Sequence, residues 1–459
     1  MNGIAGQKIS VIGAERSGVA VAKLLQSKNA KVFVSDFGRN ERTLKNIEEL
    51  KAERIECEFG VHSERAYDCS FMVISPGVPA NAPVVAEAQK RGIKIVAEIE
   101  AASWFCKSPI VAITGSNGKT TTTTLLGRIF SDAKKKHVVA GNIGTAFSSV
   151  VLDVDEETVV VLEVSSFQLD FIDTFRPKIA VLLNITQNHM DRYEHSMEKY
   201  ASSKARIFKN QTAEDALIAN AEDFWTKEKV KSAKPKLFYF STRQKVSNGA
   251  FVEGDMLKTN MLTTDYSILN TREISIKGEH NLQNAMAATL AAQLMGIGPA
   301  YIKATLRNFK GVEHRQESVR EVNGVKYINN SKATTVEAVE VALKSYDEPI
   351  VLIMGGKDKG NDYSTIYDLV KRKVKAIVAT GYSADTIVKN FADKVKVKKV
   401  ATIGEKIPNI ESMQKTVNAA ASLASSGDIV LLAPACTSFD WFTDYEERGR
   451  VFKQIVNQL

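Results

Sequence analysis

Short apolar runs alternate with helix-forming stretches along almost the whole chain, and this alternation constrains the fold more than any other feature of the sequence. Such runs occur at residues 9–12, 110–113 and 350–354, and the segments between them have helical patterns. This order is typical of parallel sheets with helices on their faces, so the sequence predicts an α/β fold. The apolar runs fall far short of the roughly 20 residues that span a bilayer, so we expect no membrane insertion.

The 459 residues are predicted to form three α/β domains, at residues 1–97, 98–311 and 312–459. Residues 234–276 are rich in Ser, Thr, Asn and Lys and predict a small antiparallel insertion or edge. The expected strands lie at residues 9–12, 31–35, 71–75, 93–96, 110–113, 159–163, 179–184, 326–328, 350–354, 376–380, 399–403 and 428–432.

The composition is that of a globular protein, with 44% hydrophobic and 25% charged residues. The four cysteines are scattered without paired or metal-type spacing, and the first residues lack the pattern of a signal peptide. We therefore expect a cytoplasmic protein without disulfide or zinc. The formal net charge of +8 favours an anionic ligand, and because the longest basic run is only Lys134 to Lys136, a small anion is favoured over nucleic acid.

The sharpest local signal is the sequence TGSNGKTT at residues 114–121, placed between an apolar strand and a helix. Glycines allow backbone amides to turn toward phosphate oxygens, and the start of the helix adds positive potential. Lys119 is expected to reach the β and γ phosphates of a nucleotide, and Thr120 to bind magnesium. The segment predicts a phosphate-binding loop, although Ile113 stands where the strict pattern has its first glycine.

A second glycine turn at residues 13–18 follows the first predicted strand, and Asp36 ends the next one. The spacing is G-x-x-x-x-G, which departs from the dinucleotide fingerprint, so NAD binding and UDP-type diphosphate binding both stay open. A rigid turn, Ser75-Pro76-Gly77, follows a third strand at the predicted carboxyl edge of the same sheet. The pattern predicts a ligand site there.

Glu163 and His189 lie at or just past the ends of strands in the domain that holds the phosphate loop. Carboxylate and imidazole side chains beside bound phosphates would suit magnesium. Each alone is more often structural, and their combination with the phosphate loop favours a metal site.

Together the motifs resemble the Mur ligase family, ATP-dependent amide-forming enzymes of peptidoglycan synthesis. The resemblance covers essentially the whole chain and lies in residues 114–121, 163–168, 184–191, 200–204, 280–285, 314–315, 327–334, 355–360, 434–440 and 447–449. It implies a Rossmann-like nucleotide-sugar domain, a central phosphate-loop ATPase domain and a Rossmann-like C-terminal domain. The C-terminal motif is most similar to the D-glutamate-adding branch, which implies that D-glutamate is joined to UDP-N-acetylmuramoyl-L-alanine through an acyl phosphate.

The resemblance also implies a monomer that uses ATP and two magnesium ions, with Lys119, His189 and Lys204 as catalytic residues. ATP is expected at Gly115, Ser116, Asn117, Gly118, Lys119, Thr120, Thr121, Asn284, Arg315, Asn330 and Lys332. The UDP sugar is expected at Gly13, Ser17, Gly18, Asp36, Ser75, Pro76, Gly77, Asn142 and Ser165. D-glutamate is expected at Thr334, Lys359, Ser438 and Tyr445, and magnesium at Thr120, Glu163, His189 and Lys204.

By the same resemblance, Lys204 would be carbamylated, which requires its amine to lose a proton first and therefore a lowered pKa. The family commonly has acidic residues where Asn188 and Asn330 stand, so altered nucleotide contacts are expected. Three alternatives stay open. A folylpolyglutamate synthase-like ligase would not need the first domain, a nucleic-acid-stimulated NTPase would fit the basic charge, and an NAD-linked dehydrogenase would fit the first glycine turn.

Overall fold

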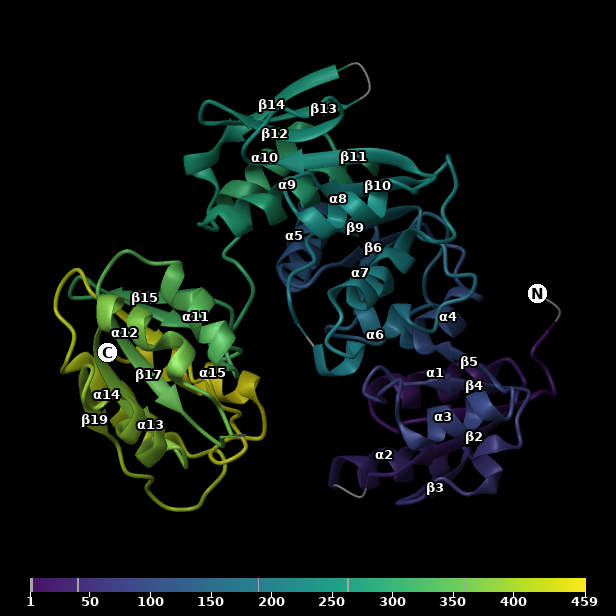
Figure 1. Cartoon of the computed structure of the whole chain (residues 1–459), viewed down its shortest axis with the longest axis horizontal. Helices are drawn as coiled ribbons and strands as arrows, with labels where there is room; N and C mark the ends of the chain where they lie inside the picture. The colour runs from purple at the N-terminus through teal and green to yellow at the C-terminus, as the bar shows by residue number, and fades with distance from the viewer. Residues whose placement is uncertain (1–2, 39–40, 189, 262–263, 359) are drawn as a thin grey trace. The chain divides into compact units, whose positions relative to one another are not determined.

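Figure 1 shows the computed structural model, which describes residues 3–38, 41–188, 190–261, 264–358 and 360–459. The chain separates into two compact units, Met1–Phe309 and Lys310–Leu459. The first unit contains two sheets and the second contains one, and helices accompany all three. The fold is α/β, as the alternation of apolar and helical segments predicts. Among the described residues, no helix combines the length and the apolar character that a membrane span requires.

The first sheet has five parallel strands in the order β3-β2-β1-β4-β5. Its elements are β1 (Lys8–Ile12), α1 (Arg16–Ser27), β2 (Lys31–Asp36), α2 (Glu41–Ala52), β3 (Glu56–Phe59), the 3₁₀ turn η1 (Glu64–Tyr67), β4 (Phe71–Ile74), α3 (Pro83–Lys90), β5 (Lys94–Ala97) and α4 (Glu98–Ser103). The order reverses between β1 and β4, so the loops after these two strands meet at the carboxyl edge, where open sheets bind ligands. The edge strand β3 was not expected, because two glutamates interrupt its apolar residues.

The second sheet has nine strands in the order β14-β13-β12-β11-β10-β9-β6-β8-β7. Its strands are β6 (Ile110–Thr114), β7 (His137–Gly141), β8 (Val159–Glu163), β9 (Ile179–Leu182), β10 (Ala216–Asn220), β11 (Lys236–Ser241), β12 (Gly249–Glu253), β13 (Met256–Met261) and β14 (Thr264–Asn270). Every residue of β6, β8 and β10 is buried, which explains why each strand is apolar up to its last residue.

The helical segments of the second sheet's domain are α5 (Lys119–Asp132), η2 (Phe147–Ser149), α6 (Ser166–Leu169), η3 (Met190–Tyr193), α7 (Met197–Ala205), η4 (Arg206–Phe208), α8 (Phe224–Val230), η5 (Thr271–Glu273), α9 (Glu279–Leu294) and α10 (Pro299–Asn308). Helices α5 and α9 pack against each other. Strands β12, β13 and β14 form the expected antiparallel edge, in teal in Figure 1, whereas β11 pairs in parallel with β10 and β12.

The third sheet, in the second unit, has six strands in the order β15-β16-β20-β17-β18-β19. Its elements are β15 (Glu317–Val322), β16 (Val325–Asn329), α11 (Val336–Lys344), β17 (Ile350–Gly355), η6 (Ser364–Ile366), α12 (Tyr367–Lys373), β18 (Val374–Thr380), α13 (Ala384–Phe391), β19 (Lys396–Lys399), α14 (Ile410–Ala421), β20 (Ile429–Leu432) and α15 (Tyr445–Val456). Among the described strands of this third sheet, only the β15–β16 pair is antiparallel.

The two edge strands of the third sheet depart from the sequence prediction. The prediction of a strand at residues 399–403 was wrong, because β19 lies at Lys396–Lys399. Three lysines on this exposed edge strand hide the apolar pattern from which strands are predicted. Strand β15 was not expected, because charged residues alternate along it. The apolar central strands were placed correctly because they are buried on both faces.

Candidate active site

The phosphate loop lies between β6 and α5, and Gly118 forms its last turn before the helix. Gly118 has a φ of +84°, and a Cβ atom there would lie 2.2 Å from Oδ1 of Asn284. Both observations require glycine at this position. Asn284 is buried on α9 and accepts a hydrogen bond from the Thr122 hydroxyl at 3.2 Å. Helix α9 therefore closes directly onto the loop and brings a predicted ATP residue to it.

Two lysines converge on one carbonyl of the loop. Lys119 Nζ donates to the Gly115 oxygen at 2.8 Å and to the Ser116 oxygen at 3.0 Å, and Lys204 Nζ donates to the same Gly115 oxygen at 2.8 Å. Lys204 is only 2% exposed. Burial, and then the charge of Lys119, lower the pKa of Lys204 well below its ordinary value, although Asp170 opposes this shift. The proton loss that carbamylation requires is therefore favoured.

A second wall of the loop comes from the segment after β9. The side-chain oxygen of Asn184 accepts from the Asn117 amide at 2.9 Å, and its side-chain nitrogen donates to the Asn117 carbonyl at 3.2 Å. The Ser116 hydroxyl donates to the Thr186 carbonyl at 2.8 Å. Residues 184–186 belong to the family resemblance, but the sequence assigned them no role. Their place directly after a strand that pairs with β6 could have indicated one.

Glu163 ends β8 and is 1% exposed. Its Oε1 atom accepts from Asn142 Nδ2 at 2.9 Å, whereas its Oε2 atom is buried without a hydrogen-bond partner. A buried carboxylate oxygen without a partner is costly, and a hard cation such as magnesium would satisfy it. Glu163 thus fits its predicted role. Lys204 as a protonated ammonium offers no ligand to a cation, whereas its carbamate would supply an anionic oxygen of the kind that magnesium prefers. His189 lies outside the described residues.

A cavity of about 1120 Å³ opens at the carboxyl edge of the first sheet. It is lined by seven of the nine predicted sugar-nucleotide residues: Gly13, Ser17, Asp36, Ser75, Pro76, Gly77 and Asn142. The other two have structural contacts. A Cβ atom at Gly18 would lie 1.7 Å from the Gly13 oxygen, so Gly18 allows the turn to pack closely. Ser165 caps α6 in a capping box with Gln168.

The wall of this cavity is fixed by polar contacts. Asp36 accepts from the Ala14 amide at 2.5 Å and from the Gly38 amide at 2.6 Å, and the Ser75 hydroxyl donates to the Gly13 oxygen at 3.0 Å. Arg16, which sequence reasoning did not single out, donates to the Gly144 carbonyl. The glycine turn is therefore tied to the loop that carries Asn142.

The second unit brings further predicted residues together after β16 and at the start of α15. Lys332 Nζ lies 5.1 Å from the centre of the Tyr445 ring, and Oδ1 of Asn330 accepts from the Gln316 amide at 3.2 Å. Ser438 is 2% exposed, and its carbonyl accepts from the Trp441 and Phe442 amides. Thr334 and the half-buried Arg315 belong to the same unit. The predicted Lys359 lies outside the described residues.

Arg448 is a buried residue of this unit that received no predicted role. Its guanidinium donates to the Ser331 hydroxyl at 3.0 Å, to the Ser331 carbonyl at 2.8 Å and to the Cys436 carbonyl at 3.1 Å. Burial lowers the pKa of Arg448 to about 10, although nearby Asp440 opposes this. Arg448 thus joins the loop after β16 to the loop after β20. A buried contact of this kind leaves no periodic signal in the sequence.

The chain combines a phosphate loop, a separate cavity at a glycine turn and a third sheet that is accompanied by helices. These features define a class of multidomain nucleotide-binding proteins. Family models match at residues 7–97 (Mur ligase MurD-like, N-terminal domain), 113–292 (Mur ligase middle domain) and 314–436 (Mur ligase, glutamate ligase domain). The chain is 43% identical to the UDP-N-acetylmuramoylalanine–D-glutamate ligase of Chloroherpeton thalassium, over 99% of both chains. It is 42% identical to that of Pelotomaculum thermopropionicum, over 99% of this chain and 98% of the relative. The chain belongs to the Mur ligase family.

Solved structures share the fold at much lower identity. UDP-N-acetylmuramate-alanine ligase MurC from Thermotoga maritima matches with a TM-score of 0.59 and 18% identity, over 98% of this chain and 99% of that one. MurF from Acinetobacter baumannii matches with a TM-score of 0.60 and 15% identity, over 98% of this chain and 93% of that one. These likenesses extend across the whole chain and confirm the predicted fold class.

Proposed function

We propose that this chain is an ATP-dependent ligase that adds D-glutamate to UDP-N-acetylmuramoyl-L-alanine in the synthesis of peptidoglycan precursors. The observation that carries the proposal is the identity of 43% over 99% of both chains with a protein named for that reaction. The reaction activates the alanyl carboxylate as an acyl phosphate, which the amine of D-glutamate then attacks to form the amide and release phosphate.

In this proposal the cavity of the first sheet binds the nucleotide sugar. Its volume of about 1120 Å³ lies slightly above the usual range for small-molecule sites. Residues of the glycine turn, including Ser17, line this cavity together with Ser75. Asn142 lines it as well and donates to Glu163, so the acceptor substrate and the phosphate site are expected to meet near this amide.

ATP is proposed to bind the phosphate loop. Lys119 is expected to exchange its loop carbonyls for phosphate oxygens and so to offset the charge that develops during transfer. Asn284 would border the nucleotide from α9, and Arg315, Asn330 and Lys332 are proposed as further ATP-binding residues. Asn330 offers an amide where the family commonly has a carboxylate, so its nucleotide contact is expected to lack a charge.

We further propose magnesium as the cation of the site, with Thr120, Glu163, His189 and carbamylated Lys204 as ligands for two ions. Magnesium would polarise the transferred phosphoryl group and neutralise the anions that gather around it. The partnerless Oε2 atom of Glu163 supports one ion. The buried position and lowered pKa of Lys204 support the modification that a second ion requires.

D-glutamate is proposed to bind the second unit, at Thr334, Lys359, Ser438 and Tyr445. A substrate with two carboxylates needs cationic and hydroxyl donors, which these side chains supply. The proposed domain limits are residues 1–97, 98–311 and 312–459, and we propose a cytoplasmic monomer that works on small molecules without nucleic acid.

The test is phosphate release from ATP by the purified protein with UDP-N-acetylmuramoyl-L-alanine and either D-glutamate, L-glutamate or no amino acid. Release that requires both the nucleotide sugar and D-glutamate supports the proposal. Release that is indifferent to the sugar and stimulated by a folate would favour the folylpolyglutamate synthase alternative. Stimulation by DNA or RNA would overturn the ligase.

A further inference from the structure

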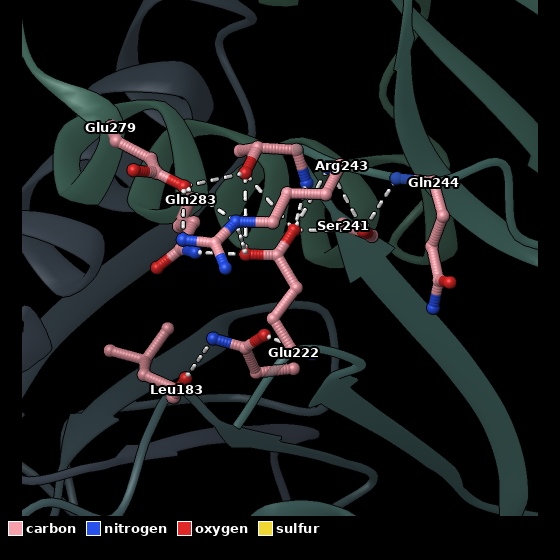
Figure 2. A network of polar contacts seen from close by, with 9 residues as sticks. Leu183, Glu222, Ser241, Arg243, Gln244, Glu279 and Gln283 are labelled. Atoms are coloured by element: carbon pink, nitrogen blue, oxygen red, sulfur yellow. Dashed lines mark hydrogen bonds and ion pairs between the residues drawn. The ribbon is translucent and has the colours of Figure 1, made fainter. Parts of the chain in front are cut away.

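Glu222, just after β10, is the centre of the polar network in Figure 2. Its Oε1 atom accepts from the Ser241 hydroxyl at 2.8 Å and from the Arg243 amide at 3.0 Å, and it also accepts from the Thr242 amide. Its Oε2 atom accepts from Gln283 Nε2 at 2.9 Å. The carboxylate therefore joins the loop after β11 to helix α9. Neither Glu222 nor its partners belong to the site residues described above.

The first turn of α9 depends on this network. Its N-cap residue, Gly278, offers no side-chain cap to the free amides of the helix. Glu279, the first residue of the helix, accepts from the Thr242 hydroxyl at 3.1 Å and from Arg243 Nε at 3.3 Å, which attaches the first turn to the loop after β11. Figure 2 shows Glu279 and Gln283 on the same side of the Glu222 carboxylate, with Glu279 above Gln283. The loop after β11 thus contacts the first turn of α9 through Thr242 and Arg243.

The bond from Glu222 ends on the residue next to Asn284. Asn284 Oδ1 is the atom that leaves no room for a side chain at Gly118, and it accepts from the Thr122 hydroxyl. A rotation or shift of α9 that broke the Glu222–Gln283 bond would therefore move Asn284 against the phosphate loop. Because interiors are close-packed, a displacement of one turn is transmitted to the next.

A second connection runs from the same segment to the opposite wall of the loop. Asn220 Nδ2 donates to the Leu183 carbonyl at 3.0 Å, and its Oδ1 accepts from the Glu222 amide at 2.8 Å. The residue after Leu183 is Asn184, which pairs with Asn117 of the phosphate loop. Residues 220 and 222 thus support both walls of the loop.

We propose that Glu222 is a positioning residue for the ATP site, acting through Gln283 and Asn284 on the phosphate loop. The inference rests on the proposed ATP-dependent function. The negative charge is essential to this role, because the carboxylate faces only donors. An amide at this position would turn its own N–H groups toward some of them and leave partly buried donors without acceptors.

The test compares Glu222→Gln with a matched control, Asp215→Asn, at the other end of β10. Asp215 is buried, whereas Glu222 is partly buried, and Asp215 accepts from the Thr212 amide at 2.9 Å and pairs with Arg176 at 2.7 Å. It lies at the end of the strand remote from the phosphate loop. Each substitution removes one carboxylate charge that flanks β10, so a general loss of stability would affect both variants.

For Glu222→Gln we expect the Kd for ATP, measured by calorimetry, and the KM for ATP to rise roughly tenfold, the size of one charge-assisted hydrogen bond. The KM for the nucleotide sugar is expected to stay within about twofold, since its cavity lies on the other sheet. Asp215→Asn is expected to lower thermal stability and leave the KM for ATP unchanged.

A second variant, Gln283→Ala, removes the link to α9 and leaves the bonds from Glu222 to residues 241–243 in place. It should raise the KM for ATP by a similar factor and lose less stability than Glu222→Gln. If Glu222→Gln does not fold, Gln283→Ala tests the positioning role of Glu222 by itself. Unchanged ATP binding in a folded Glu222→Gln or Gln283→Ala protein overturns the inference. Wild-type protein that binds no ATP would instead overturn the proposed function.

Discussion

The contact between Gly118 and Asn284 can be tested by Gly118→Ala, whose cost follows from the structure. A side chain at a φ of +84° costs about 1 to 2 kcal/mol. The new Cβ atom would lie 2.2 Å from Asn284 Oδ1, so Asn284 must retreat and lose its bond from Thr122, at a further cost of about 1 kcal/mol. We expect a total loss of about 2 to 3 kcal/mol around α5 and α9.

The measurement is native-state hydrogen exchange of the amides of α5 and α9, which reports local stability. In the double variant Gly118→Ala/Asn284→Ala the backbone strain persists but the collision is absent. The double variant should therefore lose about 1 kcal/mol less than the sum of the single losses. Gly254→Ala is the matched control, because Gly254 has a φ of +59° and no atom near its Cβ position. It isolates the backbone cost in its own turn, between β12 and β13. Additive losses in the double variant would refute the contact.

Four further outcomes are expected. Lys119→Ala should abolish phosphate release while circular dichroism stays unchanged; normal turnover would exclude the phosphate role. Lys204→Ala should be inactive and partly recover with a short carboxylate in the buffer, and full activity without it would exclude the carbamate. In carbonate-free buffer, Lys204→Met should be more stable than wild type in urea at neutral pH. The unfolded chain binds the Lys204 proton more tightly than the folded chain does. The free energy of unfolding of the wild type therefore rises with pH between the lowered folded pKa and about 10.5, and the stability advantage of Lys204→Met shrinks over that range. An advantage that grew with pH would contradict this prediction. Asp36→Ala should loosen the turn at Ala14 and raise the KM for the nucleotide sugar about tenfold, which corresponds to the loss of one hydrogen bond to a charged group, and leave the KM for ATP unchanged. A raised KM for ATP with an unchanged KM for the nucleotide sugar would contradict the role proposed for the cavity.

The sequence was most informative where a local requirement is strong. Gly118 could be placed because glycine, strand and helix signals coincide within a few residues, and the buried strands β6 and β17 could be placed because they are apolar throughout. The exposed edge strands β15 and β19 were missed or misplaced because their charged side chains mask the period. Propensity is a weak guide where a strand has no buried face.

Residues that act through distant contacts had no signal of their own. Lys204 reads as an ordinary helical lysine, and only the family resemblance gave it a role; the structure then buries it against Gly115. Arg448 and Glu222 obtain their partners from segments far away in the chain. Such contacts depend on tertiary packing, which no local pattern contains.

The shared amide of Asn142 limits which substitutions could evade an antibacterial compound that binds the large cavity. The residue lines the large cavity and also satisfies one oxygen of Glu163, whose other oxygen is already without a hydrogen-bond partner. A compound anchored on Asn142 could be escaped by replacing that residue with an apolar one. That replacement would leave both oxygens of a buried carboxylate unpaired, a penalty of roughly 1 to 3 kcal/mol for a neutral group and more for a charged one. Resistance by this route would weaken the enzyme that it protects.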